Sequence, residues 1–139
     1  NAELAGEMSG HMFFSDRYLG YDDALYATCR LLEIIANTGK TVSELIEDLP
    51  ITFTTPEIRV DCADDIKFDV VKKITAKFKE KYKVIDIDGM RALFEDGWGL
   101  VRASNTQPAL VLRFEAATEK RLDEIRNEVE TALNKIIKG

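Results

Sequence analysis

The segment KVIDIDGMRALFEDGWGLVRASNTQPALVLRFEA, residues 83–116, decides the fold. It consists of apolar stretches separated by short polar turns, and two of the turns contain Asp88-Gly89 and Asp96-Gly97. Asp-Gly between apolar stretches is a strong signal for a β-hairpin. The last stretch, ALVLRFEA (109–116), alternates as a strand with one covered face does. The segment therefore predicts antiparallel strands joined by hairpins.

A helix is predicted on each side of these strands. The first covers about residues 66–81 and begins after an aspartate cap, Asp64 or Asp65. The second covers about 119–137 and has Thr118 as its cap. Both carry apolar residues at steps of three and four, which places those residues on one face. These residues are Phe68, Val71, Ile74 and Phe78 in the first helix, and Leu122, Ile125, Val129, Leu133 and Ile136 in the second.

One further strand is predicted before the first helix, because EIRVDC (57–62) alternates with Ile58, Val60 and Cys62 on one face. The order is therefore strand, helix, hairpin-linked strands, helix. Elements with one apolar face are best covered when helices pack on one side of an antiparallel sheet. We expect an α+β domain over residues 51–139, with two helices on one face of the sheet.

Residues 1–50 have a different pattern. Asp22 is the expected cap of their main helix, and Thr41 and Glu44 have the spacing of a capping box. A region of this length is too short to bury a core alone, so we expect it to be the end of a preceding α/β domain. The boundary is placed in DLPITFTTPE (48–57), which has no helical period. The elements expected here are a loop at the start, a short strand at 11–14, and helices over about 22–37 and 42–48.

Composition limits the kinds of partner. The 139 residues carry a formal net charge of −6, with 45% apolar and 32% charged residues, as in soluble globular proteins. An acidic chain without a long basic run is a poor candidate for binding nucleic acid or an anionic membrane. No apolar run approaches the roughly 18 residues of a membrane span, and there is no signal-peptide pattern.

The two cysteines, Cys29 and Cys62, do not form a disulfide framework. Both lie in segments with an apolar pattern, since Cys29 is in register with Leu25, Leu32 and Ile35 of the predicted helix. We therefore expect buried free thiols. Free thiols favour a reducing, cytoplasmic location.

The loop RASNTQP (102–108) joins two predicted strands and is rich in hydrogen-bond donors. Ser104, Asn105 and Thr106 offer hydroxyls, an amide and backbone N–H groups, and Arg102 adds a guanidinium. Phosphate is well matched by a guanidinium together with a concave set of neutral donors. The alternative is a plain polar turn, which the composition alone favours.

The loop GEMSGH (6–11) contains the single histidine of the chain. Glu7 accepts hydrogen bonds, Ser9 donates and accepts them, and His11 exchanges protons near neutral pH. A carboxylate beside a hydroxyl matches neighbouring sugar hydroxyls. The alternative is a flexible terminal loop with an incidental histidine, which these residues alone favour.

Together the two loops resemble the α-D-phosphohexomutase family, and within it the bacterial phosphomannomutase/phosphoglucomutase branch. GEMSGHMFFSDRYLGYDDALYA (6–27) is similar to the sugar-recognition loop and following helix of the family's third domain. GWGLVRASNTQPALVLRFEA (97–116) is similar to the phosphate-binding region of its fourth domain, whose fold resembles TATA-binding protein. The resemblance covers essentially the whole chain. It implies that residues 1–50 end domain 3 and that residues 51–139 form domain 4.

The resemblance also implies a role for each loop residue. Glu7 and Ser9 would bind sugar hydroxyls, with His11 beside them to assist proton transfer. The phosphate that is not being transferred would be held by Arg102, Ser104, Asn105 and Thr106. The family moves a phosphoryl group between the 1- and 6-positions of a hexose through a phosphoserine, a bisphosphate intermediate and Mg²⁺.

Parts of the family's catalytic machinery are missing from this sequence. It contains neither the Ser-His nucleophile loop nor the DGDGD loop that binds Mg²⁺. Asp61, Asp64 and Asp65 are interpreted as caps and solvated charge, so we expect no metal ligands here. We therefore expect the chain to be an excised C-terminal piece of such an enzyme. Its expected partners are hexose phosphate and the missing N-terminal domains of the same chain, and we expect it to be inactive alone. Within the family, phosphoglucosamine mutases tend to carry Gln at the position of Met8 and SGT where this chain has SNT (104–106). The resemblance therefore favours mannose or glucose phosphate over the amino sugar as substrate.

Two alternatives remain open from the sequence. The first is a free-standing, non-catalytic phosphosugar-binding module that kept the phosphate loop. The second is a nucleic-acid binder, which the TATA-binding-protein-like topology suggests. The net charge and the expected lack of a basic sheet face argue against the second, and fold alone is a weak argument for function.

Overall fold

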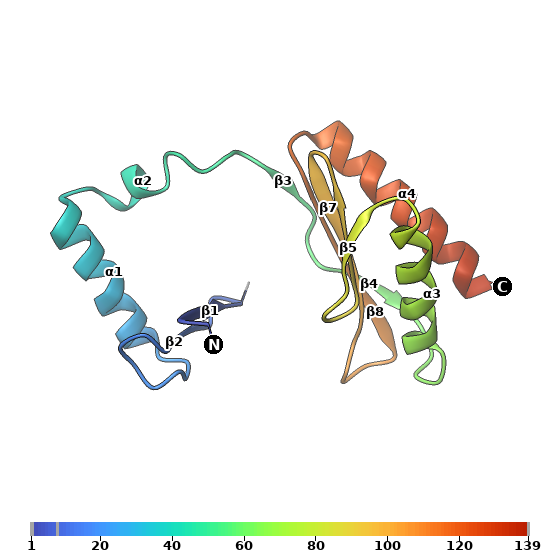
Figure 1. The fold of residues 1–139 in the computed structure, drawn as a ribbon, viewed down its shortest axis with the longest axis horizontal. Coiled ribbons are helices and arrows are strands. Elements are labelled where there is room, and N and C mark those ends of the chain that lie inside the picture. The colour runs from blue at the N-terminus through green and yellow to red at the C-terminus, as the bar shows by residue number, and fades with distance from the viewer. Residues whose placement is uncertain (1, 8, 139) are drawn as a thin grey trace. The chain divides into compact units, whose positions relative to one another are not determined.

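The computed structural model describes residues 2–7 and 9–138 of the chain. It contains two compact units, Asn1–Leu49 and Pro50–Gly139. The second unit is an antiparallel sheet with strand order β3-β8-β7-β6-β5, in which β4 also pairs with β8 (Figure 1). Its elements are β3 (Phe53–Thr54), β4 (Ile58–Asp61), α3 (Lys67–Lys79), β5 (Lys83–Ile85), β6 (Met90–Phe94), β7 (Gly97–Ala103), β8 (Ala109–Ala116) and α4 (Glu119–Lys138).

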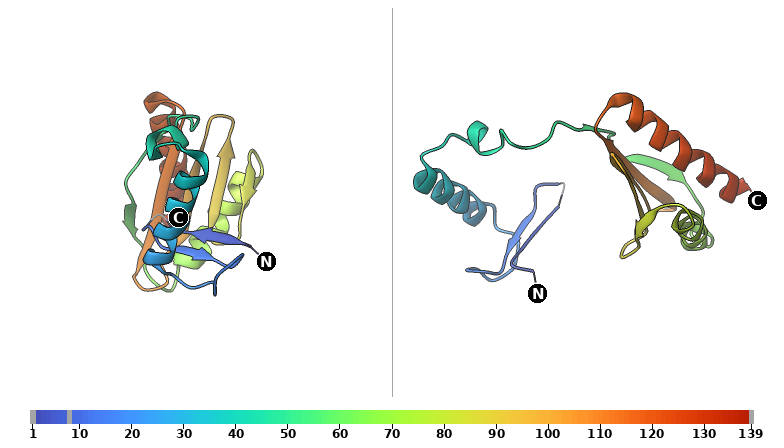
Figure 2. Two further views of the ribbon diagram at one scale, coloured as in Figure 1. Left: turned by 90° about the vertical axis from the view of Figure 1, so that its left-hand side faces the viewer. Right: turned by 45° about the horizontal axis from the view of Figure 1, so that its top comes forward.

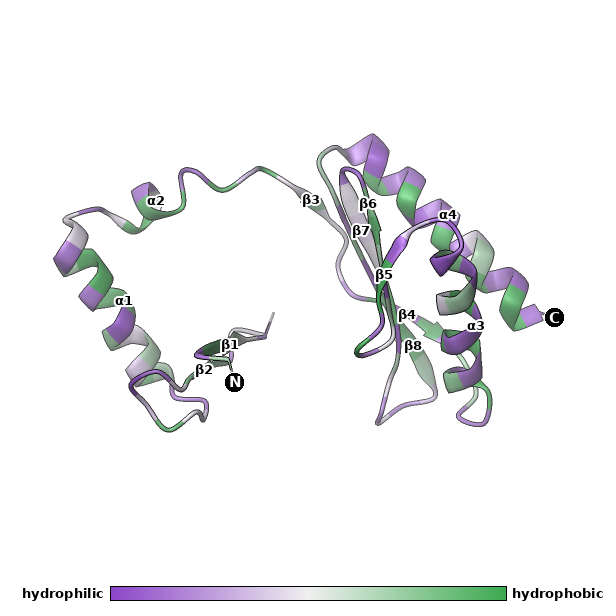
Figure 3. Ribbon diagram, viewed as in Figure 1, coloured by the Kyte–Doolittle hydropathy of each residue, from purple (hydrophilic) through white to green (hydrophobic). Residues whose placement is uncertain are grey.

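Helices α3 and α4 pack on the same face of this sheet (Figures 1 and 2). Most strand residues that alternate toward the helices are buried, as are the helix residues that face them, and the edge residues Ile58, Val60 and Phe94 are partly buried. In Figure 3 the colours of α4 alternate along its length between hydrophobic and hydrophilic. The predicted α+β fold is therefore confirmed. Its largest fully buried side chains are Ile74, Met90, Val101, Leu110, Leu112, Phe114, Ile125, Val129 and Leu133.

Both Asp-Gly dipeptides occur at hairpins, but their glycines serve different purposes. Gly89 lies in the turn between β5 and β6 and has a φ of +84°, which glycine adopts without steric cost. Gly97 already belongs to β7 and pairs with Phe94 and Ala116. A Cβ at Gly97 would lie 2.4 Å from the Glu115 carbonyl oxygen. Glycine at position 97 thus permits close packing within the sheet, whereas glycine at position 89 permits both the turn and a close approach to β7.

The start of α3 differs from the prediction. Its N-cap is Ile66, with no side-chain capping bond, and neither Asp64 nor Asp65 caps the helix. The Asp64 carboxylate instead accepts a hydrogen bond from Lys67 Nζ. Phe68 is 51% exposed, because the buried face of the first turn is formed by Lys67 and Val70. Thr118 caps α4 as predicted, since its hydroxyl accepts from the Arg121 N–H.

The first unit contains β1 (Leu4–Gly6), β2 (Met12–Phe14), α1 (Ala24–Thr38) and α2 (Val42–Leu45). The prediction of a loop at the start was wrong, because β1 pairs antiparallel with β2. Thr41 and Glu44 form the predicted capping box of α2. Asp23 caps α1, so the prediction of Asp22 was wrong by one residue.

Helix α1 has the predicted apolar face, but that face is not buried. None of its residues, all of which the structure describes, is buried, and Leu25 is 81% exposed. Cys29 is consequently an exposed thiol, which contradicts the prediction, whereas Cys62 is buried as predicted. Burial raises the pKa of the Cys62 thiol above its ordinary value. Within the described part of the chain, no helix has the length and apolar character needed to span a membrane.

Candidate functional site

The loop GEMSGH is the turn of the β1–β2 hairpin. The Glu7 N–H donates to the His11 carbonyl at 2.9 Å, and the Gly10 N–H donates to the Glu7 carbonyl at 3.0 Å. Gly10 has a φ of +90°, which closes the turn. Ser9 Oγ donates to Glu7 Oε2 at 3.1 Å, so the predicted carboxylate and hydroxyl lie side by side. Met8 lies outside the described residues.

His11 is held by Asp22, immediately before α1. Its Nδ1 lies 2.7 Å from Asp22 Oδ2, and the Met12 N–H donates to Asp22 Oδ1 at 3.1 Å. The hydrogen bond and the charge of Asp22 raise the pKa of His11, and the same bond lowers the pKa of Asp22. The His11 side chain remains 53% exposed, so the imidazole is accessible from solvent.

Two adjacent aspartates, Asp22 and Asp23, precede α1, and the sequence alone did not show which of them contacts His11. Asp23 accepts a hydrogen bond from the Tyr26 N–H at 3.0 Å and another from the Tyr18 hydroxyl at 2.5 Å. The rings of Tyr18 and Tyr26 are stacked with their centroids 3.9 Å apart. Asp23 is therefore committed to the helix start, and Asp22 is the carboxylate that faces His11.

The loop RASNTQP leaves β7 and enters β8. The Ser104 N–H donates to the Ala109 carbonyl at 2.9 Å. The Ser104 hydroxyl accepts from the backbone N–H groups of Thr106 and Gln107 at 3.4 and 3.2 Å. The side chains of Asn105 and Thr106 are exposed at the tip. Three of the predicted phosphate-binding residues, Ser104, Asn105 and Thr106, thus lie together on one short, hydrogen-bonded turn that directly follows Arg102 and Ala103 of β7.

Arg102 is paired with Asp88 in the β5–β6 turn, which the sequence did not predict. Its Nη1 lies 3.2 Å from Asp88 Oδ2, and its side chain is 41% exposed. The neighbouring Gly89 packs directly on the backbone of Arg102. A Cβ at Gly89 would lie 2.4 Å from the Val101 carbonyl oxygen and 2.8 Å from Arg102 Cα. In the Asp88-Gly89 turn, Gly89 therefore packs against the backbone of Arg102, and Asp88 forms an exposed ion pair with its guanidinium.

Two further cations contact the loop at Gln107, and the sequence did not identify either of them. The buried Lys67 donates from Nζ to the Gln107 carbonyl at 3.0 Å and to Asp64 Oδ1 at 2.6 Å. Arg59 of β4 donates from Nη1 to Gln107 Oε1. The loop is consequently attached both to the start of α3 and to strand β4.

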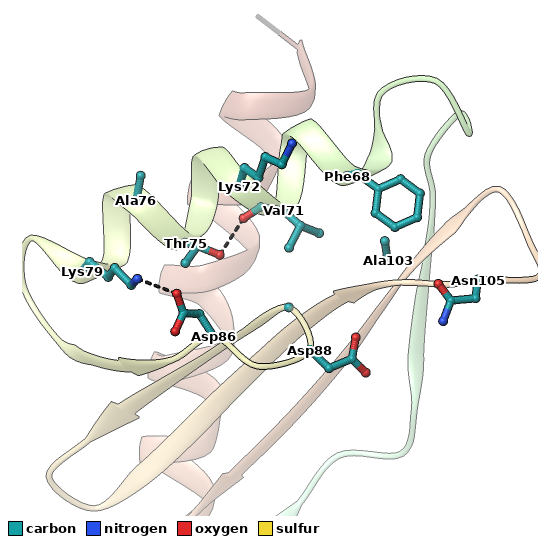
Figure 4. A pocket seen from close by; sticks show the side chains of 11 residues that line it. Phe68, Val71, Lys72, Thr75, Ala76, Lys79, Asp86, Asp88, Ala103 and Asn105 are labelled. Atoms are coloured by element: carbon teal, nitrogen blue, oxygen red, sulfur yellow. Dashed lines mark hydrogen bonds and ion pairs between the residues drawn. The ribbon is translucent and has the colours of Figure 1, made fainter.

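A cavity of about 400 Å³ lies between α3 and the β5–β6 turn and reaches Asn105 (Figure 4). Phe68, Val71 and Ala103 provide apolar lining. At its far side Lys79 forms an ion pair with Asp86 at 2.5 Å. The cavity gives the phosphate loop an open, mixed polar and apolar neighbourhood within its own unit.

The sheet face opposite the helices carries several arginines. Arg59, Arg91 and Arg102 project from this face, which was not expected to be basic. The Arg91 guanidinium lies 4.3 Å from the Trp98 ring centroid. Arg59 and Arg102 are paired with Glu57 and Asp88. Across residues 2–7 and 9–138, no group of three or more His, Cys, Asp or Glu side chains is placed so that it could hold a metal ion.

Comparison with known proteins identifies both units. Residues 57–132 match the family model of the phosphoglucomutase/phosphomannomutase C-terminal domain, and residues 1–53 match that of its alpha/beta/alpha domain III. Phosphomannomutase/phosphoglucomutase from Pseudomonas syringae pv. tomato is 44% identical over 137 residues, 97% of this chain and 29% of the relative. Phosphoglucomutase from Neisseria gonorrhoeae is 44% identical over 135 residues, 95% of this chain and 29% of the relative.

Solved structures agree with these matches. A phosphoglucomutase/phosphomannomutase family protein from Burkholderia thailandensis superimposes with a TM-score of 0.81 at 42% identity, covering 97% of this chain and 28% of that one. An N-acetylphosphoglucosamine mutase from Aspergillus fumigatus, at 18% identity and a TM-score of 0.51, shares the fold. The chain spans about three tenths of the length of the curated relatives it matches. It belongs to the phosphoglucomutase/phosphomannomutase family, as the resemblance of its two loops predicted.

Proposed function

We propose that this chain supplies sugar and phosphate recognition in a phosphohexomutase that interconverts hexose 1-phosphate and hexose 6-phosphate. Residues 1–50 form the last part of domain III with the sugar-binding loop, and residues 51–139 form the C-terminal domain with the phosphate-binding loop. The relatives support this enzyme class, because they are phosphomannomutases and phosphoglucomutases. One observation carries the proposal, namely the accessible guanidinium of Arg102 beside a loop of exposed neutral donors.

The RASNTQP loop binds the phosphate that is not being transferred. A guanidinium presents parallel N–H donors to two phosphate oxygens, and a phosphate dianion competes well with the single Asp88 contact at 3.2 Å. The neutral donors around Arg102 come from Ser104, Asn105 and Thr106. Because all of these groups recognise the phosphate and not the carbon that carries it, the site accepts a 1-phosphate or a 6-phosphate.

The GEMSGH loop binds the sugar. The adjacent Glu7 carboxylate and Ser9 hydroxyl, 3.1 Å apart, match two neighbouring sugar hydroxyls as acceptor and donor. His11 is held by Asp22 with a raised pKa, so it carries a proton over a wider pH range than a free histidine. It donates that proton, or a hydrogen bond, to a sugar oxygen.

The proposed phosphoserine and the proposed Mg²⁺ ligands would lie in the part of the enzyme that corresponds to the unmatched length of the relatives. Mg²⁺ neutralises charge on a phosphoryl group during transfer. The residues of this chain bind and orient the substrate, so the chain is inactive alone. The complete enzyme works on mannose or glucose phosphate in the cytoplasm.

A titration of the 139-residue chain with glucose 6-phosphate tests this function. The backbone amide NMR signals of residues 102–107 are expected to shift in a saturable way, and the Arg102→Gln variant is expected to lose that response. Unchanged signals at saturating phosphosugar, or an identical response of the variant, would contradict the proposal.

The alternative is a phosphosugar-binding module without a catalytic partner. A chimera separates the two functions. In it, the chain replaces the corresponding C-terminal part of the Pseudomonas syringae relative, to which it is 44% identical. If the chain is part of a mutase, the chimera is expected to catalyse Mg²⁺-dependent conversion of glucose 1-phosphate. A folded, phosphate-binding chimera without conversion would favour the module.

A further inference from the structure

Arg59 and Arg102 lie in one row across the open face of the sheet. Arg59 of β4 pairs with Val111 of β8, and Val111 pairs with Arg102 of β7. Directly paired residues point to the same face. With adjacent strands about 4.8 Å apart, the Cα atoms of the two arginines are about 10 Å apart. Two long side chains at this spacing reach a common anion.

This row ends at the phosphate loop. Arg102 is two residues before Ser104, and the Arg59 guanidinium already contacts the side chain of Gln107. The loop is thus flanked by one guanidinium from β7 and another from β4. Val111 lies between them in this row and is 5% exposed, so neighbouring groups already cover it.

Each arginine is neutralised by an exposed or partly exposed carboxylate in this structure. Arg59 Nη2 lies 2.8 Å from Glu57 Oε1, and Arg102 Nη1 lies 3.2 Å from Asp88 Oδ2. The side chains of Arg59 and Arg102 are 54% and 41% exposed. Partners of this kind contribute little stability, so an incoming dianion can replace them.

We propose that Arg59 is a second phosphate-binding residue, which acts with Arg102 from the other side of the loop. The inference rests on the proposed phosphate site and extends it to a strand that carries none of the loop's own residues. One guanidinium binds two oxygens of a terminal phosphate, and the second guanidinium binds the remaining oxygen together with the loop donors. The Gln107 side chain holds Arg59 at the loop when no phosphate is bound.

The test measures binding of inorganic phosphate and of glucose 6-phosphate to the 139-residue chain by amide NMR titration. Arg59→Gln is expected to weaken both affinities about tenfold, the effect of losing a charged hydrogen bond. Arg59→Lys is expected to fall between, because it keeps the charge and loses the planar fork. Arg91→Gln is the matched control, since it removes the same charge from the same sheet face and leaves affinity within about twofold.

The Arg59 side chain itself separates direct binding from an indirect effect. If Arg59 contacts phosphate, the Arg59 Nε–H signal shifts on addition of phosphate with the same concentration dependence as the amide signals of residues 102–106. An Arg59 Nε–H signal that stays unchanged while those amide signals saturate would overturn the proposal. So would an affinity of Arg59→Gln equal to that of Arg91→Gln.

The Arg102→Gln variant distinguishes a missing role of Arg59 from a missing phosphate site. If Arg102→Gln loses phosphate binding and Arg59→Gln binds phosphate normally, only the proposed role of Arg59 is contradicted. Normal binding in Arg102→Gln contradicts the phosphate site itself. Amide signals outside residues 57–62 and 102–109 report whether each variant is folded.

Discussion

The buried ammonium of Lys67 donates a hydrogen bond to the backbone carbonyl of Gln107, 40 residues further along the chain. Lys67 is 4% exposed and also pairs with Asp64 at 2.6 Å. A buried charge is tolerated when its hydrogen bonds are satisfied, as they are here. The interaction joins the start of α3 to the phosphate loop, so the stability of the unit and the conformation of the loop depend on one side chain.

Replacement of Lys67 by Met is expected to lower the free energy of unfolding by about 2 kcal/mol, the value of charged hydrogen bonds. The Asp64 side chain is 69% exposed, so its carboxylate returns to water and adds little further cost. Urea unfolding measures the change. Lys72→Met is the control, because Lys72 is 79% exposed and 3.6 Å from Asp69, an arrangement that contributes less than about 1 kcal/mol. Equal losses in the two variants would contradict the anchoring role.

The His11–Asp22 pair predicts a defined pH response. Asp22 raises the pKa of His11, so the stabilisation by the charged imidazole is complete below the ordinary pKa of about 6.5. It is lost as the pH rises through the higher pKa of the folded state. For Asp22, whose pKa is lowered, stabilisation is present above its ordinary pKa and is lost as the pH falls through the folded value.

Asp22→Asn is therefore expected to move the pKa of His11 down toward 6.5. An NMR titration of the imidazole measures this directly, because the chain contains one histidine. Asp16→Asn is the control, since Asp16 is paired with Arg30 at 2.8 Å. An unchanged His11 pKa in Asp22→Asn would show that the contact does not persist in solution.

The parts of the fold that local signals determine were predicted from the sequence. The Asp-Gly hairpins, the Thr118 cap and the alternation of β8 each depend on residues close together in the chain. The contacts of Arg102 with Asp88 and of Arg59 with Gln107 depend on which strands are neighbours. Apolar and polar alternation places a residue on a face but does not give the strand order, so these contacts could not be predicted.

Helix α1 illustrates a second limit. Its periodicity identified an apolar side correctly, but periodicity does not tell whether another element covers that side. Leu25 and Leu32 are 81% and 57% exposed, and Cys29 is exposed with them. The candidate site shows the same limit at Asp22. The sequence identified two aspartates before the helix, and only the three-dimensional arrangement assigned one to the cap and one to His11.

Asp88 is expected to compete with phosphate for Arg102. Asp88→Asn removes a negative charge beside the site, so it is predicted to tighten phosphate binding by about threefold to tenfold. The effect is expected to decrease as salt is added, because Asp88 is 68% exposed. Isothermal or NMR titration with inorganic phosphate measures it. Asp86→Asn, which removes a carboxylate paired with Lys79, is the matched control. Weaker binding in Asp88→Asn would mean that Asp88 positions the guanidinium instead of competing for it.

Alanine substitutions at Gly89 and Gly97 distinguish an effect on the position of Arg102 from a general loss of stability. Alanine at position 89 meets a positive φ and a backbone oxygen at 2.4 Å, and alanine at position 97 meets a backbone oxygen at the same distance. Both Gly89→Ala and Gly97→Ala are therefore expected to destabilise the unit by more than about 1 kcal/mol in urea unfolding.

Because Gly89 packs on Arg102 Cα, Gly89→Ala is also expected to weaken phosphate binding severalfold under conditions where the protein is folded. Gly97 lies at the other end of β7, so Gly97→Ala is expected to keep its phosphate affinity. If both folded variants bind phosphate as the original chain does, the turn at residues 88–89 does not set the geometry of Arg102.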